Sequence, residues 1–287
     1  MFNKLAFNPA YAGSHEMPCI SGIHRSQWVG FDGAPTSQTL NFHTPLFGKR
    51  VGLGVSVQHD KIGPTNSYWA NVSYAYRMQI EDGVLSIGVQ GSLRRYAVNF
   101  SETESIAPSD LAVLEGDANR MLPNFGVGIY YNTELFYAGW SVPYVINGNI
   151  SLYDVLQSSA DIAVEESHHY IMAGLKLGLS ETIKLKPAMM VKKVKDAPID
   201  LDIHGSVVFN DRLGLGATYR LGGIRNSAGE SIDLIAYLHF DSGMRLGLAY
   251  DYTLSEVRRY NSGSFEIMLE QCLKGKNDRL TNPRFFF

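Results

Sequence analysis

The sequence predicts an all-β protein: a closed antiparallel transmembrane β-barrel of about 14 strands, with short periplasmic turns and long extracellular loops. Three observations predict it: the alternation of apolar and polar residues, the length of the alternating segments and the order of the connections. In residues 213–221, for example, leucine, alanine and tyrosine alternate with glycine, threonine and arginine. Because successive side chains of a strand point to opposite faces, such a strand has one apolar face, which a barrel turns toward lipid.

The alternation recurs along nearly the whole chain. We expect strands at residues 17–29, 36–46, 51–60, 67–78, 84–99, 122–132, 135–143, 168–180, 182–194, 199–209, 212–221, 231–240, 243–252 and 263–273. Most are close to the length of about ten residues that a tilted strand needs to cross a bilayer, and they exceed typical soluble strands. No segment has a sustained apolar period of about 3.6 residues, so a helical domain is not expected.

The connections favour a membrane barrel over a soluble β-sandwich, which is the alternative. Tight turns follow every second strand, with the sequences "FGKR", "EDG", "NTE", "SET", "ND" and "DS". Longer joins follow the others: "KIGPTN", residues 100–121, residues 144–167, "GGIRNSAGE" and "TLSEVRRYNS". Outer-membrane barrels sort their connections in this way, whereas a sandwich has no reason to do so. An even number of strands places both termini on the periplasmic side.

The composition agrees with this fold. The 287 residues carry a net charge of −3, which offers no basic surface for nucleic acid. The mean hydropathy of −0.09 is also expected of a barrel, because half of each strand faces water. No run of about 18 apolar residues could form a membrane helix. Trp28, Trp69 and Trp140 lie near strand ends, where interfacial aromatic residues would sit.

The two cysteines lie near the periplasmic ends of the first and last predicted strands. Closure of the barrel pairs these two strands, so Cys19 and Cys272 should be near neighbours. An oxidising periplasm would permit a disulfide between them, although the geometry of a cross-strand disulfide is demanding. The sequence leaves open whether the bond forms.

The chain divides into three parts. Residues 1–16 precede the first strand and contain Leu5, Phe7 and Tyr11, which would be exposed unless they pack into the periplasmic mouth as a plug. Residues 17–273 form the barrel, whose lumen at about fourteen strands would otherwise approach porin width. Residues 274–287 begin with charges and contain a proline, so they form a periplasmic tail.

No catalytic signature is found: the chain has no GxSxG, HExxH or P-loop sequence. We therefore predict no enzyme activity and assign no catalytic, cofactor-binding or metal-binding residue. His168 and His169 are adjacent, so in a strand they face opposite sides. Asp200, Asp202 and His204 share one face and could hold a cation, but we interpret them as lumen residues. Their expected neighbours on the preceding strand are Lys184, Lys186 and Lys192.

Six stretches identify a family. They are "FNPAYAGS" (7–14), "QWVGFDGAPTSQTLNFHTPL" (27–46), "DKIGPT" (60–65), "LPNFGVGIYY" (122–131), "KLKPAMMVKKVKDAPIDLDI" (184–203) and "YDYTLSEVRRYNSGSFEIML" (250–269). In this order they resemble the PorP/SprF family of outer-membrane proteins of the type IX secretion and gliding motility system. Members usually have a signal peptide and a short polar segment ahead of the "MFN" found here, so we expect Met1 to be an internal residue or the start of a shortened chain.

The resemblance implies a barrel in the outer membrane of a Gram-negative bacterium, with its termini in the periplasm, that helps large surface adhesins leave the cell and stay attached. We expect it to bind the C-terminal domain of a type IX adhesin, together with other type IX components and outer-membrane lipid. Two alternatives to this function remain. One is a core component that links the periplasmic secretion ring to the outer membrane, and the other, less expected, is a diffusion porin.

The predicted partner-binding residues are aromatic, arginine and acidic residues, because such residues on loops of a rigid scaffold make binding centres. On the extracellular loops they are Phe31, Asp32, Tyr144, Tyr153, Arg258, Arg259 and Tyr260, and in the periplasmic tail they are Phe285, Phe286 and Phe287. The tail has two interpretations, a docking peptide or an assembly signal read during insertion.

Overall fold

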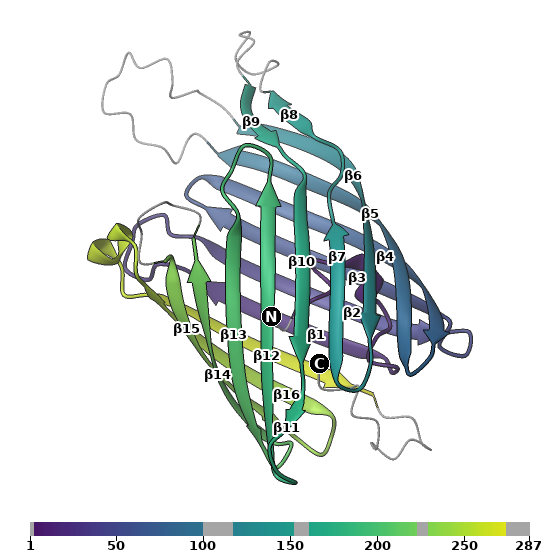
Figure 1. Cartoon of the computed structure of the whole chain (residues 1–287). Coiled ribbons are helices and arrows are strands. Elements are labelled where there is room, and N and C mark those ends of the chain that lie inside the picture. Colours follow the sequence, from purple (N-terminus) through teal and green to yellow (C-terminus); the bar gives the residue numbers. More distant parts are fainter. Residues whose placement is uncertain (1–2, 100–116, 152–160, 223–228, 274–287) are drawn as a thin grey trace, which may run out of the picture.

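Antiparallel pairing runs around the molecule without a free edge (Figure 1). The computed structural model describes residues 3–99, 117–151, 161–222 and 229–273. Each strand of the wall pairs with its neighbour along the chain, and β1 (Cys19–Ser26) closes the ring on β17 (Ser264–Cys272). Because the short β11 (Leu177–Gly178) continues β10 (His168–Leu175), the 15 segments of the sheet form the 14 predicted strands.

The strands follow the predicted order. In the first half they are β2 (Thr36–Leu46), β3 (Val51–Ile62), β4 (Thr65–Ile80), β5 (Gly83–Asn99), β6 (Asp117–Asn132) and β7 (Phe136–Val142). In the second half they are β12 (Ile183–Val194), β13 (Asp200–Phe209), β14 (Leu213–Leu221), β15 (Ser231–His239) and β16 (Met244–Thr253). The hairpin β8 (Gly148–Ser151) and β9 (Asp161–Glu165) is separate from the wall. The fold prediction is confirmed.

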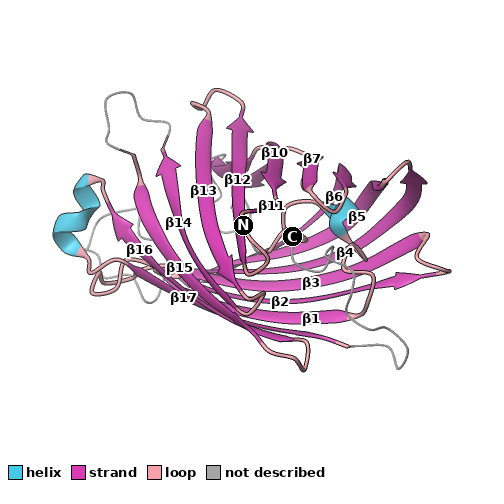
Figure 2. Cartoon of the chain, turned by 60° about the horizontal axis from the view of Figure 1, so that its bottom comes forward, coloured by secondary structure: helices cyan, strands magenta, loops and turns pink. Residues whose placement is uncertain are grey.

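The barrel has two different ends. At the end that we name the turn end, tight connections join the strands, and β1 begins and β17 finishes there. The opposite end, which we name the loop end, carries the longer connections 27–35, 100–116, 143–167, 222–230 and 254–263, together with the short connections 63–64 and 195–199. The 3-10 helix η3 (Glu256–Tyr260) stands at the loop end, whereas η1 (Pro9–Tyr11) lies within the ring of strands (Figure 2).

Two predicted loop boundaries were wrong. The join expected at 61–66 is a tight turn, because the β3–β4 ladder continues to the pair Ile62 and Thr65 and leaves only Gly63 and Pro64. Polar residues there suggested a loop, but they lie on strands. The loop expected at 100–121 is shorter, since β6 begins at Asp117, and the loop expected at 144–167 contains the β8–β9 hairpin.

The outer face of the wall is apolar. The outward residues of β3, for example, include Leu53, Val55 and Val57, which are 36 to 48% exposed. On β14, Leu213 and Leu215 also point outward, while Gly214 and Thr218 are buried. Apolar side chains exposed on every strand would be costly in water, so this face fits lipid. In the described part of the chain, no helix is long and apolar enough to cross a membrane.

Candidate functional site: the lumen and the loop-end rim

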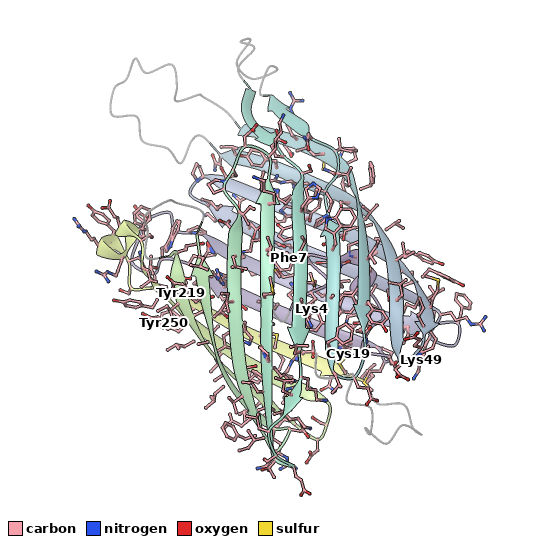
Figure 3. All side chains as sticks on the ribbon, viewed as in Figure 1. Lys4, Phe7, Cys19, Lys49, Tyr219 and Tyr250 are labelled. Atoms are coloured by element: carbon pink, nitrogen blue, oxygen red, sulfur yellow. A yellow bond between two sulfur atoms is a disulfide. The ribbon has the colours of Figure 1, made fainter. Side chains whose placement is uncertain are left out.

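The N-terminal segment, residues 3–18, lies inside the barrel. In Figure 3, Lys4 and Phe7 are seen within the ring of strands, while Cys19 lies toward the turn end. Asn8 is completely buried and donates through Nδ2 to the backbone oxygen of Ile129, at 3.0 Å. Its Oδ1 accepts from the backbone N–H of Ala10 at 2.9 Å and so caps η1. The side chain of Asn8 therefore both shapes this segment and attaches it to the wall.

Glycines on the inner face let the segment approach the wall. A Cβ on Gly88 of β5 would lie 2.5 Å from Cα of Ala10 and 2.6 Å from the carbonyl carbon of Pro9. Gly52 faces the backbone of Ala12, and Gly128 faces the side chain of Asn8. Any larger residue at these positions would occupy the space of the segment, so this wall is shaped to hold it.

Lys4 and His15 of this segment are buried. Lys4 lies with Nζ 3.7 Å from the ring centroid of Tyr137, and burial lowers the pKa of Lys4 well below its usual range, with Lys186 and Arg245 adding repulsion. Burial also lowers the pKa of His15 to about 3, with Arg245 and Lys4 adding to the effect. His15 is therefore neutral at ordinary pH.

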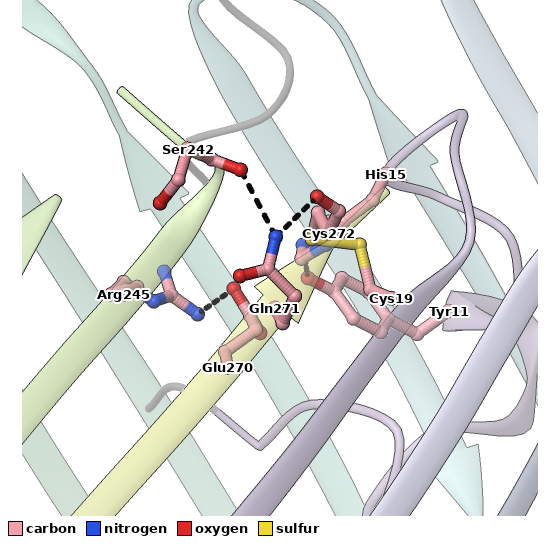
Figure 4. Close-up of a disulfide and its surroundings, with 8 residues drawn as sticks. All are labelled: Tyr11, His15, Cys19, Ser242, Arg245, Glu270, Gln271 and Cys272. Atoms are coloured by element: carbon pink, nitrogen blue, oxygen red, sulfur yellow. Dashed lines mark hydrogen bonds and ion pairs between the residues drawn. A yellow bond between two sulfur atoms is a disulfide. The ribbon is translucent and has the colours of Figure 1, made fainter. Parts of the chain in front are cut away.

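The seam of the barrel is covalently closed beside His15 (Figure 4). Cys19 and Cys272 are direct partners in the β1–β17 ladder, with Cα atoms 4.1 Å apart, and form a disulfide. The predicted proximity is confirmed, and the bond that the sequence left open is present. His15 Nδ1 lies 3.2 Å from Cys19 Sγ, and its Nε2 lies 2.7 Å from Tyr11 Oη. His15, His43 and Glu270 are also close enough to the sulfurs for metal ligation, but the disulfide leaves no thiolate to ligate.

A second segment enters the lumen from the loop end. After β7, residues 143–147 fold along the inner wall of β4 to β6: Gln90 Nε2 donates to Pro143 O at 3.3 Å, and Asn124 Nδ2 donates to Ile146 O at 2.9 Å. The ring of Tyr144 packs on Trp69 with centroids 4.7 Å apart. Tyr144 was predicted as an exposed loop residue, but it is half-buried in the lumen. Its neighbour Trp69 faces inward as well, so its predicted interfacial position was wrong.

The wall opposite these segments carries a row of charges that we name the charged ladder. Its members come from seven neighbouring strands and are Lys192, Asp202, Arg220, Asp233, Asp251, Glu266 and Arg25. Asp233 and Asp251 are directly opposed across β15 and β16, an arrangement that is repulsive on its own. Arg220 contacts Asp233 at 2.7 Å, and Arg25 forms an ion pair with Asp251. The two guanidiniums thus hold the two carboxylates in place.

Between the charged ladder and the inserted segments lies a cavity of about 510 Å³. One side is charged, with Arg25, Arg220 and Asp202, while the other side is largely aromatic, with Phe7 and Tyr144. Such a surface suits a ligand with both polar and apolar groups. The N-terminal segment forms part of the cavity's boundary, because Asn3, Ala6 and Phe7 line it.

The three residues considered for a cation do not form a cation site. Asp202 forms an ion pair with Lys192 at 2.8 Å, and His204 Nδ1 bonds to Thr218 Oγ1 at 2.9 Å. Of the three lysines expected to face them, Lys192 is directly opposite Asp200, whereas Lys184 instead binds Asp211 at the turn end. Asp202 and His204 are buried lumen residues, in agreement with the interpretation chosen from the sequence.

The structure brings some of the predicted partner-binding residues together. Loops 27–35 and 254–263 are joined by backbone hydrogen bonds of Val29 with Ser262 and Gly263, at 2.8 and 2.9 Å. This contact brings the predicted partner-binding residues of the two loops together on one surface, which we name the rim. Its members are Phe31, Asp32, Arg258, Arg259 and Tyr260, all exposed. Tyr153, Phe285, Phe286 and Phe287 lie outside the described residues.

Reasoning from sequence missed the charged ladder beyond Lys192 and Asp202. The signal was available, since Arg220, Asp233 and Asp251 all fall on the polar side of alternating strands. Placing them at one height, however, required the registers of β13 to β16. The sequence also gave no sign that residues 143–147 turn inward.

Solved structures with a similar arrangement are bacterial outer-membrane proteins. Omp33 of Acinetobacter baumannii is 8% identical over 90% of this chain and 98% of its own, with a TM-score of 0.49. Salmonella typhi OmpF is 11% identical over 89% and 97%, with a TM-score of 0.41. A mutant Rhodopseudomonas blastica porin is 9% identical over 90% and 100%, with a TM-score of 0.38. Identities and scores this low carry no argument about function.

The sequence itself gives a clearer relationship. No curated protein matches the chain. The family described as "Type IX secretion system membrane protein PorP/SprF" matches residues 1–270, which covers nearly all of the barrel and includes the N-terminal segment that fills part of its lumen. This chain therefore belongs to the PorP/SprF family of type IX secretion system membrane proteins.

Proposed function

We propose that this barrel is a non-enzymatic docking protein, which assists secretion of a type IX adhesin and anchors it at the cell surface by binding its C-terminal domain. The observation that carries the proposal is that one side of the lumen is filled by the N-terminal segment, whereas the other side holds a cavity. Residues 3–18 occupy it through bonds such as Asn8 to Ile129, while the cavity beside the charged ladder lies on the other side of Phe7. A barrel filled in this way suits binding better than free diffusion.

The proposal places the loop end outside the cell and both termini in the periplasm. Outer-membrane barrels have short periplasmic turns and long external loops, and here the turn end has only tight connections and holds the start of β1 and the end of β17. The rim and the mouth of the lumen then face the exterior, where a secreted domain would arrive.

The rim supplies the residue types that dominate binding energy at interfaces, namely tyrosine and arginine. Tyr260 is 69% exposed and Phe31 is 46% exposed, so both have apolar area to lose on binding. A stable anchor should bury at least about 1,200 Å² in total, which requires the rim together with the mouth of the lumen. Phe285 to Phe287 are proposed as an additional periplasmic docking peptide.

The test is a pull-down of the detergent-solubilised full chain from cells with and without the adhesin. The double variant Phe31→Ala/Tyr260→Ala should lose most of the captured adhesin, because truncating an interface anchor typically costs about 2 kcal/mol or more. The control is Phe47→Ala, which removes an aromatic ring that is 79% exposed at the turn end. It should capture the adhesin as the parent chain does.

Other outcomes select the alternatives. Capture of periplasmic ring proteins without any secreted cargo would favour a core component that links the ring to the outer membrane. Free ion conduction in a planar bilayer with no captured protein would favour a porin. Equal capture by the rim variant and its control would overturn the rim as the docking surface.

A further inference from the structure

A polar row crosses the outer face of the barrel near the loop end. It consists of His24, Gln38, His59, Tyr68 and Arg95, which lie on the five consecutive strands β1 to β5. Each is the direct ladder partner of the next. The arrangement is a single line of outward side chains, and we name it the polar row.

Neighbouring side chains of the polar row are in contact along its whole length. Gln38 Nε2 donates to His24 Nδ1 at 3.3 Å, and Gln38 Oε1 accepts from His59 Nδ1 at 2.9 Å. His59 stacks on Tyr68 with ring centroids 4.4 Å apart and an angle of 9°. The guanidinium carbon of Arg95 lies 5.9 Å from the Tyr68 ring centroid. These contacts fix five side chains of the outer face relative to one another.

The polar row carries positive charge. His59 Nε2 lies 3.1 Å from Asn66 Oδ1 and its Nδ1 lies 2.9 Å from Gln38 Oε1, so both ring nitrogens have polar partners. Arg95 donates through Nε to Asn119 Oδ1 at 3.1 Å, which uses one of the five donors of a guanidinium. In the next row toward the loop end, which reads Ser26, Thr36, Lys61, Asn66 and Ala97, Lys61 adds a further cation and no carboxylate is present.

The polar row marks the edge of the apolar face. The adjacent row toward the turn end contains Leu40, Val57 and Leu93, which are 42 to 54% exposed. The other sector of the barrel differs: near the loop end of β13 to β16 the corresponding outward row is Ile203, Tyr219, Ile232 and Tyr252, with no charged side chain. Tyr219 and Tyr250 of that sector lie near the loop end in Figure 3. Arg95 and Lys61 therefore lie where the apolar outer face of β1 to β5 ends, on the side of the loop end.

We propose that the polar row is a binding site for the phosphorylated headgroup of an outer-leaflet glycolipid. Arginine binds phosphate oxygens through paired donors, Lys61 adds a second cation, and the apolar rows beneath take the acyl chains. The site rests on the proposed orientation, in which the loop end is external. A headgroup held here would fix the height and tilt of the barrel and hold one sector against lipid.

The test uses the purified full chain in mild nonionic detergent, with lipid A carrying both phosphates as the probe and the same lipid with both phosphates removed as its comparison. Native mass spectrometry measures the bound fraction against probe concentration. Arg95→Gln and Lys61→Gln should each weaken binding of the phosphorylated probe about fivefold, the equivalent of about 1 kcal/mol for each cation at a lipid surface. The control Arg212→Gln removes the same kind of charge from an exposed turn-end pair with Asp241 and should leave binding unchanged. Retention of the heat-dependent shift in gel mobility shows that each variant is folded.

Three results would overturn the site: equal binding of the two lipids, equal loss in Arg95→Gln and Arg212→Gln, or loss of a captured protein partner in Arg95→Gln with lipid binding intact. The binding assay in detergent does not depend on orientation. Cargo capture by Arg95→Gln should match the parent chain, so the failure of this site and the failure of the docking function can be told apart.

Discussion

At the scale of single residues, Gly88 controls whether the N-terminal segment fits. Gly88→Val should displace this segment and raise single-channel conductance several-fold, because the new side chain would meet the backbone of Pro9 and Ala10. Gly91→Val is the matched control on β5, since a Cβ there meets nothing within 4 Å, and valine is favoured in strands. Planar-bilayer recording compares the two. Equal conductance would mean that the segment does not seal the lumen.

Arg220 should stabilise the lumen. Its side chain neutralises Asp233, which is only 3% exposed and lies opposite Asp251. Arg220→Met should lower the free energy of unfolding by about 3 kcal/mol, since it leaves a buried charge without its partner. Arg212→Met in the same hairpin removes an exposed pair in which the side chains are 66 and 84% exposed, and should cost less than about 1 kcal/mol. Urea unfolding of the reconstituted barrels measures both.

His15 should make the stability of the barrel depend on pH. Its pKa is lowered to about 3 by burial, then by Arg245 and Lys4, so between that value and about 6.5 the unfolded chain binds a proton that the folded chain excludes. This contribution is complete above about pH 6.5 and is lost as the pH falls through that window, by up to about 1.4 kcal/mol per pH unit. His15→Asn should flatten the decline in unfolding free energy between pH 7.5 and 5. An unchanged slope would contradict the prediction.

At the scale of elements, the seam between β1 and β17 joins the two ends of the wall. The disulfide links residues 253 positions apart, and cross-linking so long a loop restricts the unfolded chain, with typical gains of about 2–4 kcal/mol. Cys19→Ser/Cys272→Ser should therefore lower the urea midpoint of unfolding. Without reductant, the heat-denatured parent chain should run faster on a gel than this variant, and addition of a dithiol should remove the difference. Identical mobility before reduction would show that the bond is absent.

At the scale of the whole molecule, the orientation of the barrel determines which surfaces meet cargo and lipid. A protease site inserted between residues 257 and 258, in η3 at the loop end, should be cleaved on intact cells, whereas one inserted in the turn 240–243 should be cleaved only after the outer membrane is permeabilised. The reason is that every connection at the turn end is tight, whereas all the longer connections lie at the loop end. Cleavage of the 240–243 site on intact cells would reverse the topology and with it the outer-leaflet site.

The sequence by itself determined the wall of this protein. Alternation in segments such as 213–221 decides which side chains face lipid, because the period of two is a property of any strand. The number of alternating segments gave the strand number, and closure then implied that Cys19 and Cys272 are neighbours. These conclusions need only local patterns and the requirement that a membrane barrel has no free edge.

Only the tertiary structure decided what lies inside the barrel and which side chains form the charged ladder and the polar row. The charged ladder joins seven strands, and the polar row joins five, through registers that no local pattern contains. Residues 1–16 suggested a plug, but the glycines that receive its described part, Gly52, Gly88 and Gly128, are distant in sequence. The inward turn of residues 143–147 likewise depends on Asn124 and Gln90. Contacts between distant segments depend on the closed ring, which forms only when all strands have paired.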